Sequence, residues 1–148
     1  MTFERKTSAG YLVNHMARLF ARHLEARLKA QGIALGAFPA LLHLWEQDGL
    51  TQRDLVERLG IEQPTMAATL SRMERDGLIT RQRDPGDARA QRIHLTDHAR
   101  GLRAAALAEA SAVNDIATGT LTAAEREQFL AITSRIIAAL EPSRSSDM

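Results

Sequence analysis

The chain has 148 residues, of which 45% are hydrophobic and 25% charged, and its formal net charge is +1; these values are typical of one globular domain with a substantial core and exclude an intrinsically disordered chain. The sequence contains no cysteine, which excludes a disulfide scaffold, a thiolate zinc site, a cysteine nucleophile and a thiol-based oxidant sensor. Because no apolar run reaches about 18 residues and residues 1–10 lack the apolar core of a signal peptide, we expect a cytoplasmic protein without a membrane partner.

The N-terminal part of the chain predicts two helices. Alanine and leucine, both strong helix formers, supply 25 and 19 residues, which favours a mostly α-helical fold. Between Tyr11 and Lys29 the apolar residues recur at helical spacing and form one face. A second helix is predicted over residues 36–47, because Pro39 suits its first turn and the Asp-Gly pair at 48–49 ends it.

The next segment predicts a helix-turn-helix. Thr51 and Asp54 form a capping box that opens a short helix, and Gly60 ends this helix. A second short helix begins at Pro64, a residue type favoured in the first helical turn, and ends before Gly77. Two short helices joined by a few residues are typical of this motif.

Residues 78–96 predict the only sheet that we expect. Apolar and polar side chains alternate over 78–83 and again over 91–96, as in strands with one buried face. The stretch from Asp84 to Arg89 lies between them and is rich in turn-forming residues. We therefore expect a β-hairpin with a fairly long loop.

Two helices are predicted at the C-terminal end. Thr96 caps a long helix, and the capping box of Thr122 and Glu125 opens a second helix, which Pro142 ends. Residues 141–148 are expected to form a disordered tail.

The outer helices carry more apolar surface than one small lobe can cover. Apolar stripes lie on the first helix and on the last two helices, at opposite ends of the sequence. We expect these helices to pack together and against a second copy of the chain, which gives a homodimer. The alternative is that one larger monomeric core buries them.

The helix over residues 64–76 has the composition of a recognition helix. One face carries Met66, Leu70 and Met73, which we expect to be buried. The opposite face is small and polar near its start and basic further along; it comprises Thr65, Ala68, Thr69, Arg72 and Arg75. Small side chains let the backbone approach a major groove, hydroxyl groups bond bases or phosphates, and Arg reads guanine or binds phosphate. The alternative is an ordinary amphipathic surface helix, against which the preceding helix-turn-helix spacing argues.

The hairpin supplies a second basic element. Its four arginines are Arg81, Arg83, Arg89 and Arg92. We expect the carboxylate of Asp87 to hold the guanidinium of Arg89 in one orientation. Arg89 could then enter a narrow minor groove, where the negative potential is enhanced. The alternative is a solvated ion pair that contributes little to stability.

These segments resemble the MarR family of bacterial transcription regulators. The resemblance is carried by Leu59–Arg81 (LGIEQPTMAATLSRMERDGLITR), by Asp87-Ala-Arg89 and by residues 93–96 (IHLT). It implies a single domain that is mostly α with a small β-hairpin wing. In this domain a winged helix-turn-helix lobe would span 36–95, and the dimerisation helices would span 10–30 and 97–140.

The resemblance also implies a function. A homodimer would bind double-stranded DNA at a near-palindromic operator and act as a repressor. The recognition helix would span 63–76 and the wing 79–95. The residues implied to lie nearest DNA are Thr51, Gln52, Gln63, Pro64, Thr65, Thr69, Arg72, Arg83, Asp87 and Arg89.

A small-molecule effector is a further implication of the resemblance. A small aromatic or anionic compound would bind between the dimer body and the DNA-binding lobe and release the DNA, and no cofactor is expected. The side chains that could line its pocket are Arg18, Arg22, Phe38, Leu42 and Trp45. In the alternative interpretation the three apolar residues belong to the core and the two arginines to a solvated helix face.

Three other functions receive less support. A metal-responsive regulator would need converging ligands, but Thr96 separates His94 from His98 and places them on a strand and a helix. An enzyme is not expected, because the chain lacks a phosphate-binding Gly-rich loop, His-Glu-x-x-His and Gly-x-Ser-x-Gly. A winged helix used only for protein contacts is the third alternative, and the arginine-rich hairpin argues against it.

Overall fold

We describe residues 2–142 of a computed structural model of the chain. Most of the tail expected at 141–148 lies outside this range. Within it the chain forms two compact units, one ending at Val113 and the other beginning at Asn114. None of the helices between residues 2 and 142 combines the length and the apolar character that crossing a bilayer requires.

The helices match the predicted ones, with small differences at their ends. Their bounds are α1 (Ala9–Lys29), α2 (Phe38–Glu46), α3 (Gln52–Leu59), α4 (Gln63–Arg75), α5 (Asp97–Thr118) and α6 (Ala123–Leu140). Short 3-10 turns at Arg5–Thr7 and Leu35–Ala37 precede α1 and α2. The Ser8 hydroxyl accepts a hydrogen bond from the Tyr11 amide and thereby caps α1.

The sheet is larger than the predicted hairpin. Strands β2 (Ile79–Asp84) and β3 (Asp87–Leu95) pair antiparallel, and a third strand, β1 (Leu50–Thr51), pairs with the other edge of β3. The strand order is β1-β3-β2, with Leu50 opposite Ile93. Strand β1 was not predicted, because two residues are too few to produce a visible alternation.

The prediction of a long loop over residues 84–89 is wrong. Only Pro85 and Gly86 separate the two strands, and the Asp84 carboxylate accepts a hydrogen bond of 2.9 Å from the Gly86 amide. A register shift at the end of β2 accompanies this tight reversal. As a result Asp87 already belongs to β3 and lies directly beside the turn.

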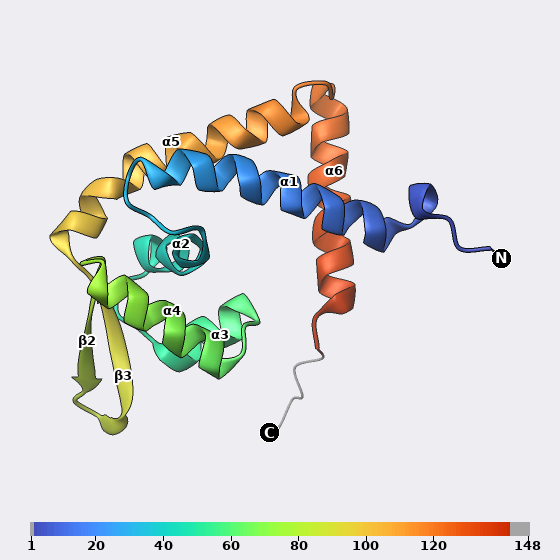
Figure 1. The fold of residues 1–148 in the computed structure, drawn as a ribbon. Helices are drawn as coiled ribbons and strands as arrows, with labels where there is room; N and C mark the ends of the chain where they lie inside the picture. The colour runs from blue at the N-terminus through green and yellow to red at the C-terminus, as the bar shows by residue number, and fades with distance from the viewer. Residues whose placement is uncertain (1, 143–148) are drawn as a thin grey trace. The chain divides into compact units, whose positions relative to one another are not determined.

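The hydrophobic core of the first unit is built around α2. Figure 1 shows α2 between one layer formed by α1 and α5 and another formed by α3 and α4. Leu28 of α1 and Leu55 of α3 are both fully buried in this core. The indole N–H of Trp45 donates a hydrogen bond of 3.0 Å to the Ala99 carbonyl and thereby links α2 to α5.

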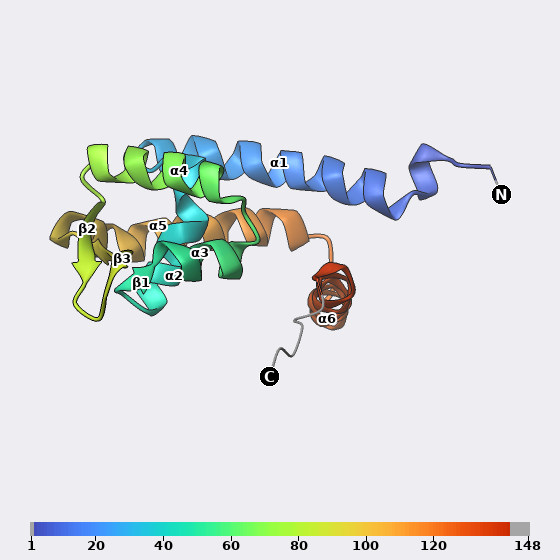
Figure 2. The ribbon, with the colours of Figure 1, turned by 90° about the horizontal axis from the view of Figure 1, so that it is seen from below.

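Helices α3 and α4 form the predicted helix-turn-helix, with the β2–β3 hairpin beside them (Figure 2). The Thr51 hydroxyl accepts a hydrogen bond from the Asp54 amide, and the Asp54 carboxylate accepts one from the Thr51 amide, both at 3.0 Å. The predicted capping box is therefore confirmed, and the Thr51 amide holds the pKa of Asp54 below its ordinary value. Gly60 ends α3 with φ +63°, a left-handed conformation that glycine adopts without steric cost.

Asp48 connects the turn after α2 to β3 and α5. Its carboxylate accepts hydrogen bonds from the Leu95 amide at 2.9 Å and from the Arg100 guanidinium at 3.1 Å. Partial burial raises the pKa of Asp48, but these two hydrogen bonds and one from the Gly49 amide outweigh burial. The net pKa lies below the ordinary value of 3.8.

The second unit contains the last residues of α5 and the whole of α6. The predicted capping box of Thr122 and Glu125 is confirmed at the start of α6, and Arg126 pairs with Asp115 at 3.5 Å. Throughout α6, which lies entirely within the described range, no residue is buried. Its exposed large apolar side chains are Leu130, Ile132, Ile136, Ile137 and Leu140.

The substitution Asp48→Asn should lower the free energy of unfolding by about 1 kcal/mol at pH 7, because it weakens two charge-assisted hydrogen bonds. A carboxyl group whose pKa is depressed in the folded state stabilises the fold above its unfolded pKa. This contribution is lost as the pH falls below about 4, so the difference from wild type should shrink by pH 3. Urea unfolding followed by the fluorescence of Trp45 measures both values.

Asp97→Asn provides the control, because Asp97 pairs with the same Arg100 at 2.9 Å but is exposed. Asp97→Asn should lower the free energy of unfolding by less than about 0.5 kcal/mol. Equal losses in the two variants, or a difference for Asp48→Asn that is no smaller at pH 3 than at pH 7, would contradict this role of Asp48.

Candidate nucleic-acid interface

Helix α4 presents the face that the sequence predicts. Met66, Leu70 and Met73 are buried in the core, so the opposite face must point to solvent. On that face Thr65, Ala68, Arg72 and Arg75 are exposed, and Thr69 is half-buried. The start of this face is therefore small and polar, and its later turns are basic, as a helix that enters a major groove requires.

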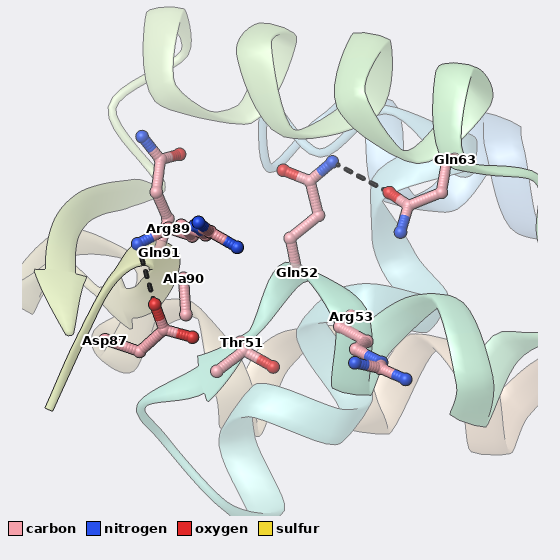
Figure 3. A pocket seen from close by; sticks show the side chains of 8 residues that line it. All are labelled: Thr51, Gln52, Arg53, Gln63, Asp87, Arg89, Ala90 and Gln91. Atoms are coloured by element: carbon pink, nitrogen blue, oxygen red, sulfur yellow. Dashed lines mark hydrogen bonds between the residues drawn. The ribbon is translucent and has the colours of Figure 1, made fainter.

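A polar pocket of about 630 Å³ lies between the hairpin and the starts of α3 and α4 (Figure 3). Its lining residues are Thr51, Gln52, Arg53, Gln63, Asp87, Arg89, Ala90 and Gln91. Five of these eight residues are among the ten that the sequence predicts to lie nearest DNA. The fold thus brings together residues from three separate segments on one concave surface.

The other five predicted residues lie outside the lining of this pocket. Pro64, Thr65, Thr69 and Arg72 belong to α4, and Arg83 belongs to β2. They continue the same polar and basic character along the recognition helix and the hairpin. None of their contacts to DNA is tested by the fold alone, and these roles stay predictions.

The starts of α3 and α4 are joined by their first side chains. The Gln52 side-chain amide donates a hydrogen bond of 3.2 Å to the Gln63 side-chain oxygen. In Figure 3 these two residues extend from the helices toward each other, while Arg89 and Gln91 come from the hairpin. Each glutamine is the first residue of its helix, where the helix dipole favours an anion such as phosphate.

Two of the four hairpin arginines are held by the protein itself. The Arg81 guanidinium donates to the Ser71 hydroxyl at 2.9 Å and lies 3.8 Å from the Glu74 carboxylate, and only 18% of its side chain is exposed. The Arg92 guanidinium donates to the Gly49 carbonyl at 2.8 Å and pairs with Asp84 at 3.1 Å. The guanidinium groups of Arg81 and Arg92 are therefore engaged within the protein.

Arg83 and Arg89 differ from this pair. Both are exposed, and within residues 2–142 neither guanidinium forms a hydrogen bond or an ion pair. The expected contact between Asp87 and the Arg89 guanidinium is wrong, because the carboxylate accepts a hydrogen bond of 3.0 Å from the Arg89 backbone amide instead. Asp87 therefore fixes the backbone beside the turn and leaves the guanidinium free to meet an external anion.

Three lining residues were not predicted: Arg53, Ala90 and Gln91. The alternation of a strand would have found Gln91, because residues 89 and 91 point to the same face. Arg53 follows Gln52 at the start of α3 and forms an exposed ion pair with Glu57 at 3.4 Å. Ala90 carries no chemical signal that a sequence pattern could reveal.

The residues predicted to line an effector pocket are placed as follows. Phe38 is buried, and Leu42 and Trp45 are half-buried against the same core. The rings of Phe38 and Trp45 meet edge to face, with centroids 6.2 Å apart. Arg18 and Arg22 are exposed on α1. This packing favours the alternative in which the three apolar residues belong to the core, and an effector contact stays a prediction.

Known proteins with similar sequences identify the family. A sequence model of the MarR family matches residues 31–90. The HTH-type transcriptional regulator TtmR of Methylorubrum extorquens (strain PA1) is 33% identical over 93 residues, which cover 63% of this chain and 48% of TtmR. The transcriptional regulator HosA of Escherichia coli O111:H- is 31% identical over 92 residues, which cover 62% of this chain and 68% of HosA. The chain belongs to the MarR family.

The MarR fold is also seen in solved structures. A MarR family transcriptional regulator from Listeria monocytogenes, in complex with a 26mer DNA, is 20% identical with a TM-score of 0.83, over 90% of this chain and 89% of that one. The predicted fold class, mostly α with a small antiparallel sheet, is confirmed. MarR proteins are transcriptional regulators and not enzymes. The matched part of the chain spans about half the length of TtmR.

Arg92→Ala should lower the free energy of unfolding by about 1 kcal/mol, because Arg92 of β3 donates a hydrogen bond to the Gly49 carbonyl and forms an ion pair with Asp84 of β2. Arg83→Ala, on the same hairpin, should change it by less than about 0.5 kcal/mol, since its guanidinium is exposed. Urea unfolding measures both values. Equal effects of the two substitutions would show that the division of the hairpin arginines is incorrect.

Proposed function

We propose that the protein binds double-stranded DNA in a sequence-specific manner and regulates transcription. The observation that supports this most strongly is the shared surface of α3, α4 and the hairpin. It combines the exposed face of α4 with a polar pocket that Arg53 and Arg89 line. A DNA duplex offers the phosphates and base edges that this combination of groups can bind.

Each element of this surface has its own role in the proposed complex. Helix α4 enters the major groove, where Thr65 near its start and Arg72 in its last turn meet base edges or phosphates. The hairpin reaches the adjacent minor groove with Arg89 of β3, and Arg83 contacts a phosphate. The start of α3, at Thr51 and Gln52, meets the DNA backbone.

We also propose that two copies of the chain form the DNA-binding unit. In the first unit, α1 exposes a run of apolar side chains, which comprises Tyr11, Leu12, Val13, Met16 and Leu19. In the second unit, the apolar side chains of α6 are exposed as well. Residues 10–30 and 97–140 would form the dimerisation body and residues 36–95 the DNA-binding lobe. A homodimer covers these faces and supplies two recognition helices to a near-palindromic operator.

The similar proteins agree with this function. TtmR and HosA are transcriptional regulators, and the Listeria monocytogenes protein of the same fold was solved in complex with DNA. We infer repression as the mode of regulation, because a dimer that occupies two successive major grooves excludes other proteins from the same DNA.

Selection of bound duplexes from a random DNA pool should return a near-palindrome with half-sites about 10 bp apart. Arg89→Ala should bind the selected duplex about tenfold more weakly without a change in melting temperature, because it removes a charged contact to DNA. Wild-type affinity should also fall steeply as salt rises, since binding releases counterions.

Arg103→Ala is the matched control, because Arg103 is an exposed arginine of α5 that lies outside the proposed interface. It should bind like wild type. Normal affinity of Arg89→Ala would disprove the role of the hairpin tip. If no duplex were enriched, the winged helix would serve protein contacts instead.

Ile136→Glu should convert the dimer to monomers, because it places a charge in the apolar face of α6. Sedimentation velocity measures this change, and operator binding should weaken with it because one lobe contacts only one half-site. Gln128→Glu introduces the same charge at a polar position of α6 and should remain dimeric. A wild-type protein that sediments as a monomer would refute the proposed assembly.

A further inference from the structure

The first residues of α3 and α4 form a side-chain pair across the helix-turn-helix. Gln52 and Gln63 are 11 residues apart, and the Gln52 Nε2 donates to the Gln63 Oε1 at 3.2 Å. Both line the polar pocket beside Arg89. Gln63 is exposed, whereas Gln52 is half-buried, so Gln52 is the more fixed member of the pair.

This pairing determines which groups of Gln63 remain available. A side-chain amide has two acceptor lone pairs on its oxygen and two N–H donors on its nitrogen. The contact with Gln52 uses one lone pair, so one lone pair and both donors of Gln63 stay free. A flip of the Gln63 amide alone would bring two NH₂ groups together, so the hydrogen bond couples the orientations of the two amides.

The free groups of Gln63 match one base. In the major groove adenine presents the N7 acceptor beside the N6 donor, and the amide of glutamine can bond both at once. Gln63 lies at the N-terminal end of α4, the part of a recognition helix that contacts base edges. A side chain already held in position loses less conformational entropy when it binds.

We propose that Gln63 reads an adenine in each half-site and that Gln52 is its positioning residue. This inference rests on the proposed function, because it specifies how the same surface distinguishes one sequence from another. Gln52 holds the Gln63 side chain in a position from which its amide can accept from N6 and donate to N7. The discrimination therefore depends on a residue outside the recognition helix.

The test is selection from a random duplex pool by the wild type, Gln63→Ala, Gln52→Ala and the double variant. Wild type should enrich an A·T pair at one position of each half-site. Gln63→Ala should reduce the preference for A·T at that position about tenfold. Gln52→Ala should reduce the same preference, while the base preferences at the other positions stay unchanged. The double variant should be no worse than Gln63→Ala, because the two residues act as one unit.

Two further variants separate positioning from structure. Gln52→Asn keeps a polar amide at the start of α3 but is one methylene too short to reach Gln63, so it should behave like Gln52→Ala. Gln82→Ala removes an exposed glutamine of β2 outside the pocket and should select the wild-type sequence. All variants should melt at the wild-type temperature.

Three outcomes would overturn the proposal. An A·T preference that survives in Gln63→Ala would show that Gln63 reads no base. A uniform loss of affinity in Gln52→Ala, with every base preference intact, would show that Gln52 has only a structural role. In both cases the wild type still selects an operator, so the proposed function stands. A wild type that enriches no sequence would refute the proposed function and this inference together.

Discussion

The burial of one face of α4 is the constraint on which the rest of the structure depends. Met66, Leu70 and Met73 are each almost completely buried, and removing such side chains from water is the dominant favourable term in folding. Once these three residues face the core, the opposite side of the helix, which carries Thr65, Ala68 and Arg72, must face solvent. The position of the functional face is therefore a by-product of packing.

The hairpin depends on the same lobe for its position. Arg81 ties β2 to α4 through Ser71, and Arg92 ties β3 to the Gly49 carbonyl before β1. Charge-assisted hydrogen bonds of this kind are stronger than neutral ones. They hold a two-stranded ribbon, which is marginally stable by itself, against the helices. Arg81 and Arg92 thus have a structural role, whereas Arg83 and Arg89 are exposed on the same hairpin.

Much of the fold could be predicted because its signals are local. The capping boxes at Thr51 and Thr122 and the helical spacing of Met66, Leu70 and Met73 depend on residues a few positions apart. The pairing of β1 with β3 could not be predicted, because it joins residues about 40 positions apart and β1 has only two residues. The tight turn at Pro85 and Gly86 was missed because the side-chain contact of Asp84 shortens a stretch whose composition suggests a longer loop.

The candidate site likewise has features that the sequence could predict and features that it could not. Its residue types could be predicted from the sequence, since five of the eight pocket residues carry polar groups at helix starts or beside the turn. The partner of each side chain could not, because Arg81 and Arg83 are indistinguishable in sequence. Only the fold decides that one meets Ser71 while the other points outward. The contact between Gln52 and Gln63 likewise requires the crossing of two helices.

Thr51 belongs to the sheet and also caps a helix, which affects how the DNA-binding lobe would fit a DNA duplex. It pairs with Arg92 as the last residue of β1 and also caps α3, so one residue joins the strand that pairs with the hairpin to the helix-turn-helix. The two parts that would enter adjacent grooves are thus parts of one stiff body. In the proposed complex such a body would keep the distance between its groove contacts fixed, and the duplex would bend or twist to fit it. Base pairs that the protein never touches would then influence affinity through their deformability.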